Sequence, residues 1–491
     1  MGGGRRRNRP RGACPLPSGA GAGAGGRGVS ARSETPRPLP DGPLVAFYGD
    51  DFTGSSAAME VLAFAGLETV LFLSTPTPER LAAFAGARAV GIAGVARSQP
   101  PAWMDRELPG PFRLLASLGA PVAHYKACST FDSAPHVGSI GRAAEIGRGI
   151  FSGDWIPMVV ADPGMGRYQS FGHLFAMAHG TGYRLDRHPT MARHPVTPMD
   201  EADLGRHLAR QTALPVGLVD FVGMKRGEGE AALDRARAEG AAIVSLDVLD
   251  AETLAEAGRL IWELGGSRVF AVGSQGVEAA LVAHWRDAGL LPAEAPVPRC
   301  TPVARIAVVS GSVSPATAGQ IAHALGHGFA GIRLDARRVV DADAFAREIG
   351  RAVMEARAAL SEGRDPLIYS AAGPDDPAVA SLREAVAGAG LDPGAASDRL
   401  GAGLGRALRE IVLAAGLTRA VIAGGDTSGH AAMQLGIDAL TALSPLDPGS
   451  PLCRAHGPDT PLDGLDLALK GGQVGRPDFF LAVKQGGRAP S

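Results

Sequence analysis

Short apolar runs alternate with stretches of helical periodicity along most of the chain, beginning near residue 41. Before residue 290, apolar runs predict strands at 44–48, 69–73, 89–93, 122–127, 157–161, 242–246 and 268–272. Stretches rich in Ala and Leu predict helices over 55–65, 231–239 and 251–264. Such alternation is typical of an α/β fold with mainly parallel sheets flanked by helices.

A proline-rich stretch near residue 295 interrupts this pattern and has the composition of a linker. The alternation then resumes, with strands predicted at 305–309, 331–334, 367–370, 420–423 and 479–483. The 491 residues exceed what one hydrophobic core usually organises, so two domains are expected. We predict an N-terminal domain over 41–290, a linker over 291–303 and a C-terminal domain over 304–491.

The composition argues against several classes of function. The formal net charge of -2 gives no electrostatic reason to expect nucleic acid or an anionic membrane as a partner. The four cysteines lie far apart without a CxxC pair, which argues against a zinc site and a disulfide framework and favours the cytoplasm. No apolar run reaches the ~20 residues that span a bilayer. Residues 1–40 are rich in Gly, Arg and Pro, and we expect a disordered extension there rather than a basic nucleic-acid arm.

Two adjacent carboxylates, Asp50 and Asp51, follow the first predicted strand and precede a helix. In an open α/β sheet, ligands bind in the crevice beyond the carboxyl ends of the strands. A carboxylate pair at that place is positioned to abstract a proton or to hold a polyol.

A second polar cluster ends the strand at 122–127 and contains Lys126, Ser129, Thr130 and Asp132. Lys126 could pair with a substrate carboxylate and Asp132 with its hydroxyls, since an acid sugar offers both kinds of group. The alternative is a solvated turn in which Ser129 or Asp132 acts as a cap. Cys128, between them, is better explained as a packed thiol than as a nucleophile.

The segment 183–199 contains Arg-His-Pro twice and presents Arg187, His188, Arg193 and His194. Each histidine precedes a proline and so prefers an extended backbone, which predicts a stiff loop. Contact with substrate or phosphate and a purely structural loop both remain open. No spacing of the histidines supports a metal site, and none is predicted.

Three strand–turn junctions in the C-terminal domain combine small residues with hydroxyls. Glycines let backbone N–H groups approach an anion, and a helix N-terminus adds unpaired amides and the positive end of its dipole. Any one junction could be an ordinary turn with an N-cap, but three in one domain favour a phosphate ligand. The candidate residues are Ser310, Ser312, Ser314, Gly424, Gly425, Asp426, Thr427 and Gly472.

These segments resemble the family of four-carbon acid sugar kinases, which includes threonate, erythronate and 3-oxo-tetronate kinases. The resemblance rests on Gly-Asp-Asp-Phe-Thr-Gly from residue 49, Lys-Ala-Cys-Ser-Thr-Phe-Asp from 126, Gly-Ser-Gln-Gly from 273, Ser-Gly-Ser-Val-Ser from 310 and Gly-Gly-Asp-Thr from 424. It implies a substrate-binding N-terminal domain, a nucleotide-binding C-terminal domain and an active site in the cleft between them. It places ATP on the C-terminal turns and Gly472, and the acid sugar near Asp50, Asp51, Lys126 and Ser129.

The sequence departs from the family pattern after Lys126. Cys128 stands where members often carry an aspartate, and Phe131, Asp132 and Ser133 replace Leu-Arg-Gly. If the missing arginine grips the substrate elsewhere in the family, Arg187 or Arg193 is the expected replacement here. This form is similar to members linked to branched acid sugars such as 3-oxo-isoapionate.

The expected reaction is phosphoryl transfer from ATP, with Mg²⁺ on the nucleotide phosphates, to a hydroxyl of a small acid sugar. Asp51 is the first candidate to accept the proton of that hydroxyl, and Asp50 is the second. The expected partners are therefore the acid sugar and ATP, and a homodimer stays open. The alternative function is a regulatory protein that binds a sugar acid or nucleotide without turnover, since fold alone does not decide between them.

Overall fold

The computed structural model describes residues 1, 36–178, 180–194 and 196–487. Contacts divide the chain into Met1–Pro36 and a compact unit over Arg37–Ser491, and the elements below belong to the second unit. Arg37 is anchored there, because its guanidinium lies 4.6 Å from the centre of the Trp262 ring and its carbonyl accepts a 3.0 Å hydrogen bond from Trp262 Nε1. Of the extension expected over 1–40, residues 2–35 lie outside the described residues.

The N-terminal half contains strands that run parallel to one another in the order β2, β3, β1, β4, β11, β5, β10 and β9. All residues of β1, β3, β4 and β11 are buried, as in strands covered on both faces. The bounds are β1 (Val45–Gly49), β2 (Thr69–Phe72), β3 (Ala89–Ala93), β4 (Val122–Lys126), β5 (Ile156–Val159), β9 (Val216–Val219), β10 (Ile243–Leu246) and β11 (Val269–Gly273).

In the C-terminal half, β13, β14, β12, β15 and β18 are parallel neighbours in that order, and β17 and β16 extend them with antiparallel pairing. Strand β16 also pairs with β2, with Leu440 opposite Leu71, so the strands of both halves form one continuous 15-stranded sheet. The bounds are β12 (Ala307–Ser310), β13 (Phe329–Arg333), β14 (Asp365–Tyr369), β15 (Arg419–Ala423), β16 (Ala439–Asp447), β17 (Ser450–His456) and β18 (Asp466–Lys470).

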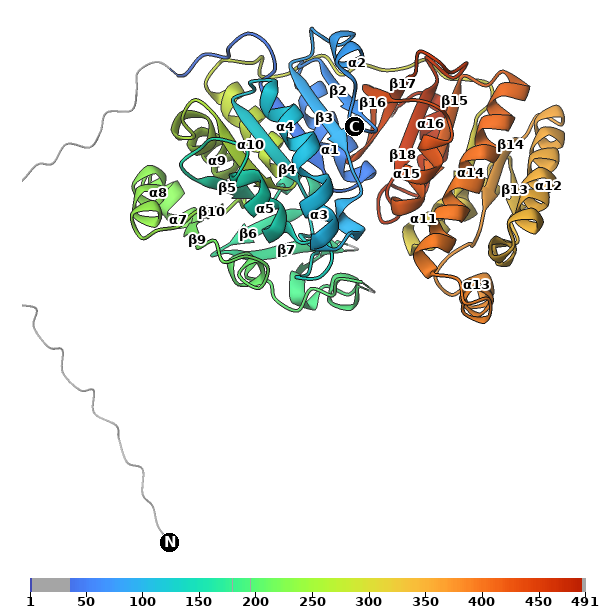
Figure 1. Cartoon of the computed structure of the whole chain (residues 1–491), viewed down its shortest axis with the longest axis horizontal. Helices are drawn as coiled ribbons and strands as arrows, with labels where there is room; N and C mark the ends of the chain where they lie inside the picture. Colours follow the sequence, from blue (N-terminus) through green and yellow to red (C-terminus); the bar gives the residue numbers. More distant parts are fainter. Residues whose placement is uncertain (2–35, 179, 195, 488–491) are drawn as a thin grey trace, which may run out of the picture. The chain divides into compact units, whose positions relative to one another are not determined.

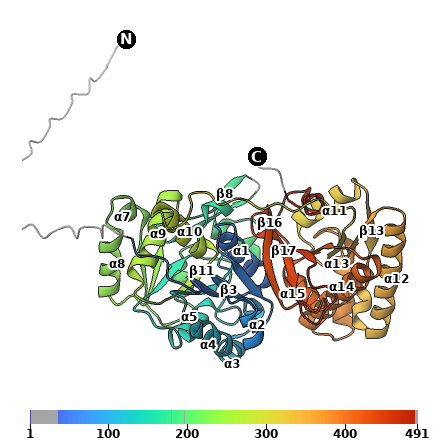
Figure 2. The ribbon, with the colours of Figure 1, turned by 90° about the horizontal axis from the view of Figure 1, so that it is seen from above.

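Helices cover both faces of this sheet (Figure 1). In the N-terminal half α1, α9 and α10 lie on one face and α3, α4 and α5 on the other (Figure 2). In this half the bounds are α1 (Phe52–Ala63), α2 (Pro78–Ala82), α3 (Pro101–Glu107), α4 (Pro109–Ser117), α5 (Ile140–Arg148), α6 (Leu204–Leu208), α7 (Phe221–Lys225), α8 (Gly229–Ala238), α9 (Ala251–Leu264) and α10 (Gly276–Asp287). In the C-terminal half they are α11 (Pro315–Leu325), α12 (Ala342–Ser361), α13 (Pro377–Gly388), α14 (Pro393–Ala415), α15 (Gly425–Met433) and α16 (Phe479–Gln485).

A separate antiparallel sheet follows β5 and consists of β6 (Arg167–Ser170), β7 (His173–Ala178) and β8 (Thr181–Arg184). Short 3₁₀ turns complete the fold at η1 (Ala96–Ser98), η2 (Pro163–Met165), η3 (Leu185–Arg187), η4 (Met191–Arg193) and η5 (Ala336–Val340). Within the described part of the chain, no helix combines the length and the apolar character needed to cross a bilayer.

The predicted α/β class with mainly parallel strands is confirmed, but one expected element is wrong. Residues 479–483 belong to helix α16, not to a strand, and Phe480 and Val483 are buried in one apolar cluster with Ile321 of α11. A short apolar run carries too little periodicity to separate a buried strand from a buried helix. The glycine-rich segment after Lys470 therefore leads from β18 into a helix. Strands β6–β9 and β16–β18 are not among those predicted from the sequence.

Close packing of α14 on α15 depends on Gly405. A Cβ at this position would lie 2.7 Å from Ala431 Cα and 2.9 Å from its carbonyl carbon. We expect Gly405→Ala to lower the free energy of unfolding by about 1–3 kcal/mol through overpacking. Gly350 in α12 is the matched control, because a Cβ there meets no atom within 4 Å and alanine gains about 1 kcal/mol in a helix. Denaturant unfolding of both variants checks this, and equal midpoints would contradict it.

Candidate active site

The carboxyl end of β1 presents the two adjacent carboxylates that the sequence singles out. Asp51 is the N-cap of α1, where its Oδ1 accepts a 2.7 Å hydrogen bond from the Gly54 amide and its Oδ2 a 3.2 Å bond from Thr53 Oγ1. Asp50 is 2% exposed, and its Oδ1 is buried without a hydrogen-bond partner in the described structure. Burial, and after it the negative charge of Asp51, raises the pKa of Asp50 to about 7. The two neighbours thus differ in basicity.

Arg97 joins this site although the sequence analysis does not name it. It lies in η1, directly after β3, and its Nη1 is 2.9 Å from Asp51 Oδ2 while its Nη2 is 2.6 Å from Asp132 Oδ2. Burial opposes ionisation of Asp51, but the charges of Arg97 and Lys126 hold its pKa below the usual value. The same arginine holds the pKa of Asp132 well below its usual range against the effect of burial. The sequence could have indicated Arg97 by its position, because it follows β3, the strand that pairs with β1.

Lys126 is the last residue of β4 and is buried. Its Nζ lies over the first turn of α1, close to Gly54. A Cβ at Gly54 would collide with both Lys126 Nζ and Asp51 Oδ1. Glycine at position 54 therefore lets the ammonium group approach the carboxylate pair. The structure brings Lys126 together with Asp50 and Asp51, as expected from their places at the ends of paired strands.

The turn after β4 is tightly built around Asp132. Thr130 Oγ1 donates a 2.5 Å hydrogen bond to Asp132 Oδ1 and lies 3.0 Å from Cys128 Sγ, and Ser129 is half-buried. Phe131 is buried with a φ of 53°, a left-handed conformation that costs energy for a residue with a side chain. Both carboxylate oxygens of Asp132 are engaged, so Asp132 holds Arg97 in place. Burial raises the pKa of the Cys128 thiol, which fits a packed, neutral group.

The segment 183–199 forms β8, η3 and η4 rather than a plain loop. His188 and His194 have extended backbones with ψ of 130° and 132°, as expected before proline. Arg187 and Arg193 are exposed. Of these four residues, the structure relates His194 to the site, since its charge contributes to lowering the pKa of Asp132.

In the C-terminal half, Ser314 is the N-cap of α11 and connects the first phosphate-type turn to the third. Its Oγ accepts a 3.1 Å hydrogen bond from the Thr317 amide and donates a very short bond to the Gly472 carbonyl. Thr317 Oγ1 donates to the same carbonyl at 3.0 Å. Ser312 is nearly buried beside Ser314, and Ser310 ends β12 with its Oγ buried and without a partner in the described structure.

Lys470 anchors the glycine-rich loop from inside. It is fully buried, and its Nζ donates to the carbonyls of Gly471 at 2.6 Å and Val474 at 3.0 Å and to Thr317 Oγ1 at 3.0 Å. Burial lowers its pKa to about 7. The sequence analysis reaches this loop through its glycines, but only the fold shows that the lysine side chain points back to hold it.

The second turn enters α15 through Gly424, whose φ of 135° suits glycine. Gly425 is the first residue of the helix, and the predicted contributions of the Asp426 and Thr427 side chains lie outside the described residues. A Cβ at Gly429 would lie 2.7 Å from the Phe52 ring, so α15 packs on the first residue of α1.

The two halves meet where their polar turns lie. A Cβ on Gly471 would lie 3.6 Å from Thr53 Oγ1, the neighbour of the carboxylate pair. Helix α1 also contacts β16, β17 and β18. The loop after Lys470 in one half thus lies beside the residue next to the carboxylate pair of the other. No three His, Cys, Asp or Glu side chains of the described residues group as metal ligands.

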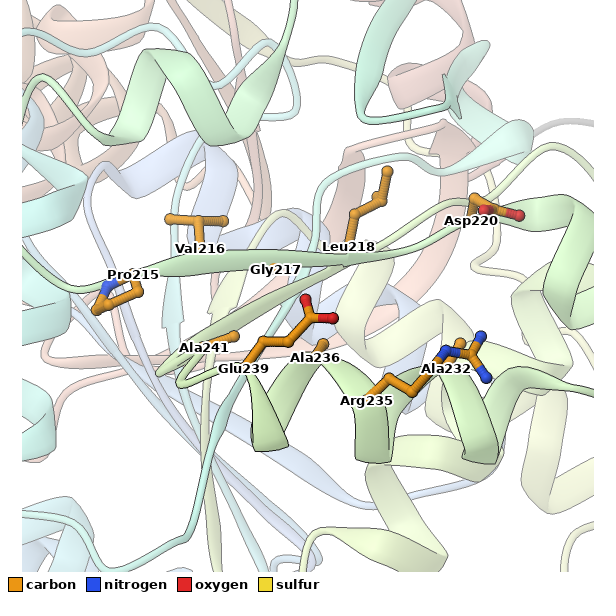
Figure 3. Close-up of a pocket in the computed structure, with 10 residues that line it drawn as sticks. All are labelled: Pro215, Val216, Gly217, Leu218, Asp220, Ala232, Arg235, Ala236, Glu239 and Ala241. Carbon is orange, nitrogen blue, oxygen red and sulfur yellow. The ribbon is translucent and has the colours of Figure 1, made fainter.

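A hollow of about 270 Å³ lies elsewhere, between β9 and α8 (Figure 3). Small residues such as Ala232, Ala236 and Ala241 line it, together with the side chains of Arg235 and Glu239. Strand β9 lies at the edge of the sheet, five positions from β1, so this hollow is separate from the carboxylates.

Comparison with known proteins supplies the family. The family model of a sugar-binding N-terminal domain matches residues 45–281, and that of a nucleotide-binding C-terminal domain matches residues 307–480. The chain is 51% identical to a 3-oxo-isoapionate kinase of Paraburkholderia graminis, over 91% of this chain and 95% of that protein. It is 32% identical to a 3-oxo-tetronate kinase of Pseudomonas savastanoi pv. phaseolicola, over 90% and 97% of the two chains.

Solved structures share the fold. A protein of Salmonella typhimurium LT2, named as a candidate tRNA synthase, superposes with a TM-score of 0.70 at 26% identity over 89% of this chain and 98% of that chain. A Haemophilus influenzae protein superposes with a TM-score of 0.64 at 23% identity, over 89% and 99% of the two chains. Taken with the two family models, these likenesses mean that the chain belongs to the family that combines a sugar-binding N-terminal domain with a nucleotide-binding C-terminal domain.

Proposed function

We propose that this protein is a kinase that transfers the γ-phosphoryl group of ATP to a hydroxyl of a small 3-oxo acid sugar, with 3-oxo-isoapionate as the first substrate to test. The observation that carries the proposal is the junction at which Thr53, beside Asp51, approaches the Gly471 turn. The printed names of the relatives support the substrate class, and 51% identity favours the branched acid over the tetronates.

Each half would contribute one ligand site. The N-terminal domain, predicted over 41–290, would bind the acid sugar at the carboxyl ends of β1, β3 and β4. The C-terminal domain, predicted over 304–491, would bind ATP at the start of α11, at the start of α15 and at the loop after Lys470. The active site would then be the cleft between them, where both ligands can meet in line.

Asp50 is the better proton acceptor of the carboxylate pair. Its Oδ1 has no hydrogen-bond partner among the described residues, and its pKa is about 7, close to the value at which a general base is most effective. Asp51 already accepts hydrogen bonds from Gly54, Thr53 and Arg97, which lower its pKa and fix its position. The roles therefore differ from the sequence-based expectation, in which Asp51 comes first and Asp50 second.

The C-terminal turns suit an anion that carries its own metal ion. Ser314 and Thr317 hold the Gly472 carbonyl, and Lys470 holds the rest of the loop from below, so the loop is shaped before a ligand arrives. Mg²⁺ prefers to keep waters and to bind phosphate oxygens, where it neutralises charge that develops in transfer.

Substrate-dependent release of ADP tests the reaction. We expect turnover with Mg-ATP and 3-oxo-isoapionate well above the rate without acid, and lower kcat/KM with 3-oxo-tetronates, threonate and erythronate. Calorimetry with ATP and with each acid provides the control. Binding of both ligands without turnover would indicate the alternative, a regulatory binding protein. Absence of ATP binding would remove the nucleotide site.

Replacing Asp50 should separate chemistry from binding. We expect Asp50→Asn to lower kcat about 10²–10⁴-fold, because the hydroxyl loses its proton acceptor, with little change in the Kd of ATP. Asp51→Asn is the comparison, since asparagine can still cap α1 but loses the charge that faces Arg97. Single-turnover rates and ATP titrations measure both. If kcat falls less in Asp50→Asn than in Asp51→Asn, Asp51 is the general base instead.

The pKa of Asp50 also predicts a pH dependence. Below about pH 7 the carboxyl is protonated and cannot accept the hydroxyl proton, so kcat/KM should rise with pH and level off above about 7. The rise should be absent in Asp50→Asn, whose residual activity no longer depends on this group. Initial rates from pH 5 to 9 measure the profile, and an unchanged limb in the variant would contradict the assignment.

A further inference from the structure

Arg167 is a cation of the N-terminal half that no predicted role uses. It begins β6, just after η2, and its Nη1 donates to the carbonyls of Met165 at 3.2 Å and Gly166 at 3.3 Å. Its Nε is buried and has no hydrogen-bond partner in the described structure. The guanidinium thus has weak local contacts and donors to spare.

The charge of Arg167 is only partly compensated. None of the ion pairs among the described residues includes Arg167, although the charge of Asp162 acts on it. Burial lowers its pKa, and the groups that oppose this effect are Cys128 and Asp162. The Cys128 thiol is itself held neutral by burial, and Asp162 is occupied by the Gly164 amide at 3.0 Å and by Gln275 Nε2 at 3.1 Å. A buried charge is normally paired, so a missing partner at a ligand site is informative.

The position of Arg167 places it with the site residues. Cys128 follows β4 two residues after Lys126, and Asp162 follows β5. In the sheet, β4, β11 and β5 are adjacent and parallel, so these residues lie at the same carboxyl edge as the carboxylate pair. The Arg167 guanidinium interacts electrostatically with Cys128 and Asp162 and therefore lies near this edge of the sheet.

The other cations nearby are already committed or exposed. Arg97 bridges Asp51 and Asp132, and Lys126 lies against the first turn of α1. Arg187 and Arg193, expected from the sequence to replace the missing arginine, are exposed, and water weakens their pairing with a carboxylate. Arg167 is a guanidinium at this edge that forms no ion pair among the described residues and retains free N–H donors.

We propose that Arg167 receives the carboxylate of the acid sugar and makes the site selective for acids over neutral sugars. This inference rests on the proposed function for the identity of the acid. A guanidinium matches a carboxylate with two parallel N–H···O bonds, which fixes orientation as well as charge. The neutral Cys128 beside it leaves the arginine free for the ligand, whereas a carboxylate at position 128 would occupy it.

The first test compares an acid with its neutral carboxamide. In the wild type we expect 3-oxo-isoapionate to have a KM about 10–100-fold below that of its carboxamide, the range for a charged hydrogen bond. Arg167→Gln should remove most of this difference, with a smaller change in kcat and an unchanged Kd for ATP. Arg167→Lys should recover part of it, because the charge returns without the fork. Equal acid preference in Arg167→Gln would overturn the inference.

A second pair of variants leaves the arginine in place. Cys128→Asp should pair with Arg167 and raise the KM of the acid about 10-fold or more, while Cys128→Ser should leave it near the wild-type value. Unfolding midpoints of all variants exclude loss of structure, and if Arg167→Gln does not fold, this pair decides. Equal KM values for the two Cys128 variants would count against the inference.

Calorimetry separates this inference from the proposed function. If the wild type binds 3-oxo-isoapionate but releases no ADP, the kinase proposal fails, while loss of acid binding in Arg167→Gln still supports the role of Arg167. If turnover occurs and Arg167→Gln retains acid preference, the kinase stands and the inference fails. If the wild type binds no acid at all, the inference fails as well.

Discussion

Parallel strands place their carboxyl ends at one edge of the sheet, and the candidate site depends on this constraint. Asp50 and Asp51 follow β1, Arg97 follows β3 and Lys126 ends β4. These strands are neighbours, so residues separated by up to 76 positions in the chain meet at one edge of the sheet. Helices on both faces exclude water from the strands, which raises the cost of every unpaired charge at that edge.

Arg97 organises the charges of this edge. By bridging Asp51 and Asp132 it keeps both carboxylates ionised against burial, while Asp50, outside the bridge, becomes basic. Two adjacent aspartates thus acquire different chemical properties from their partners, the arrangement by which active sites commonly assign acid and base roles. Arg167 stands apart from this network because it forms no ion pair among the described residues, and Asp162 is the carboxylate whose charge acts on it.

The C-terminal half uses a different device, backbone geometry held by side chains. Ser314, Thr317 and Lys470 all donate hydrogen bonds to backbone carbonyls of the loop after β18. Lys470, which forms no ion pair among the described residues, tolerates burial by donating to backbone carbonyls and to the Thr317 hydroxyl. The antiparallel pairing of β16 with β2 then continues one sheet through both halves, and α1 of the first half contacts β18 of the second.

The sequence by itself determined the α/β class, most central strands and the places where carboxylates and hydroxyls follow strands, because these features depend on local periodicity and on short motifs. It was wrong at residues 479–483, where an apolar run suits either a strand or a helix and burial against Ile321 decides. It did not reveal Arg97 or the inward Lys470 side chain as parts of the candidate site, nor Arg167, for which a role is proposed. Their roles depend on which charges lie near them and how dry the site is, and only the tertiary structure decides those distances and that burial.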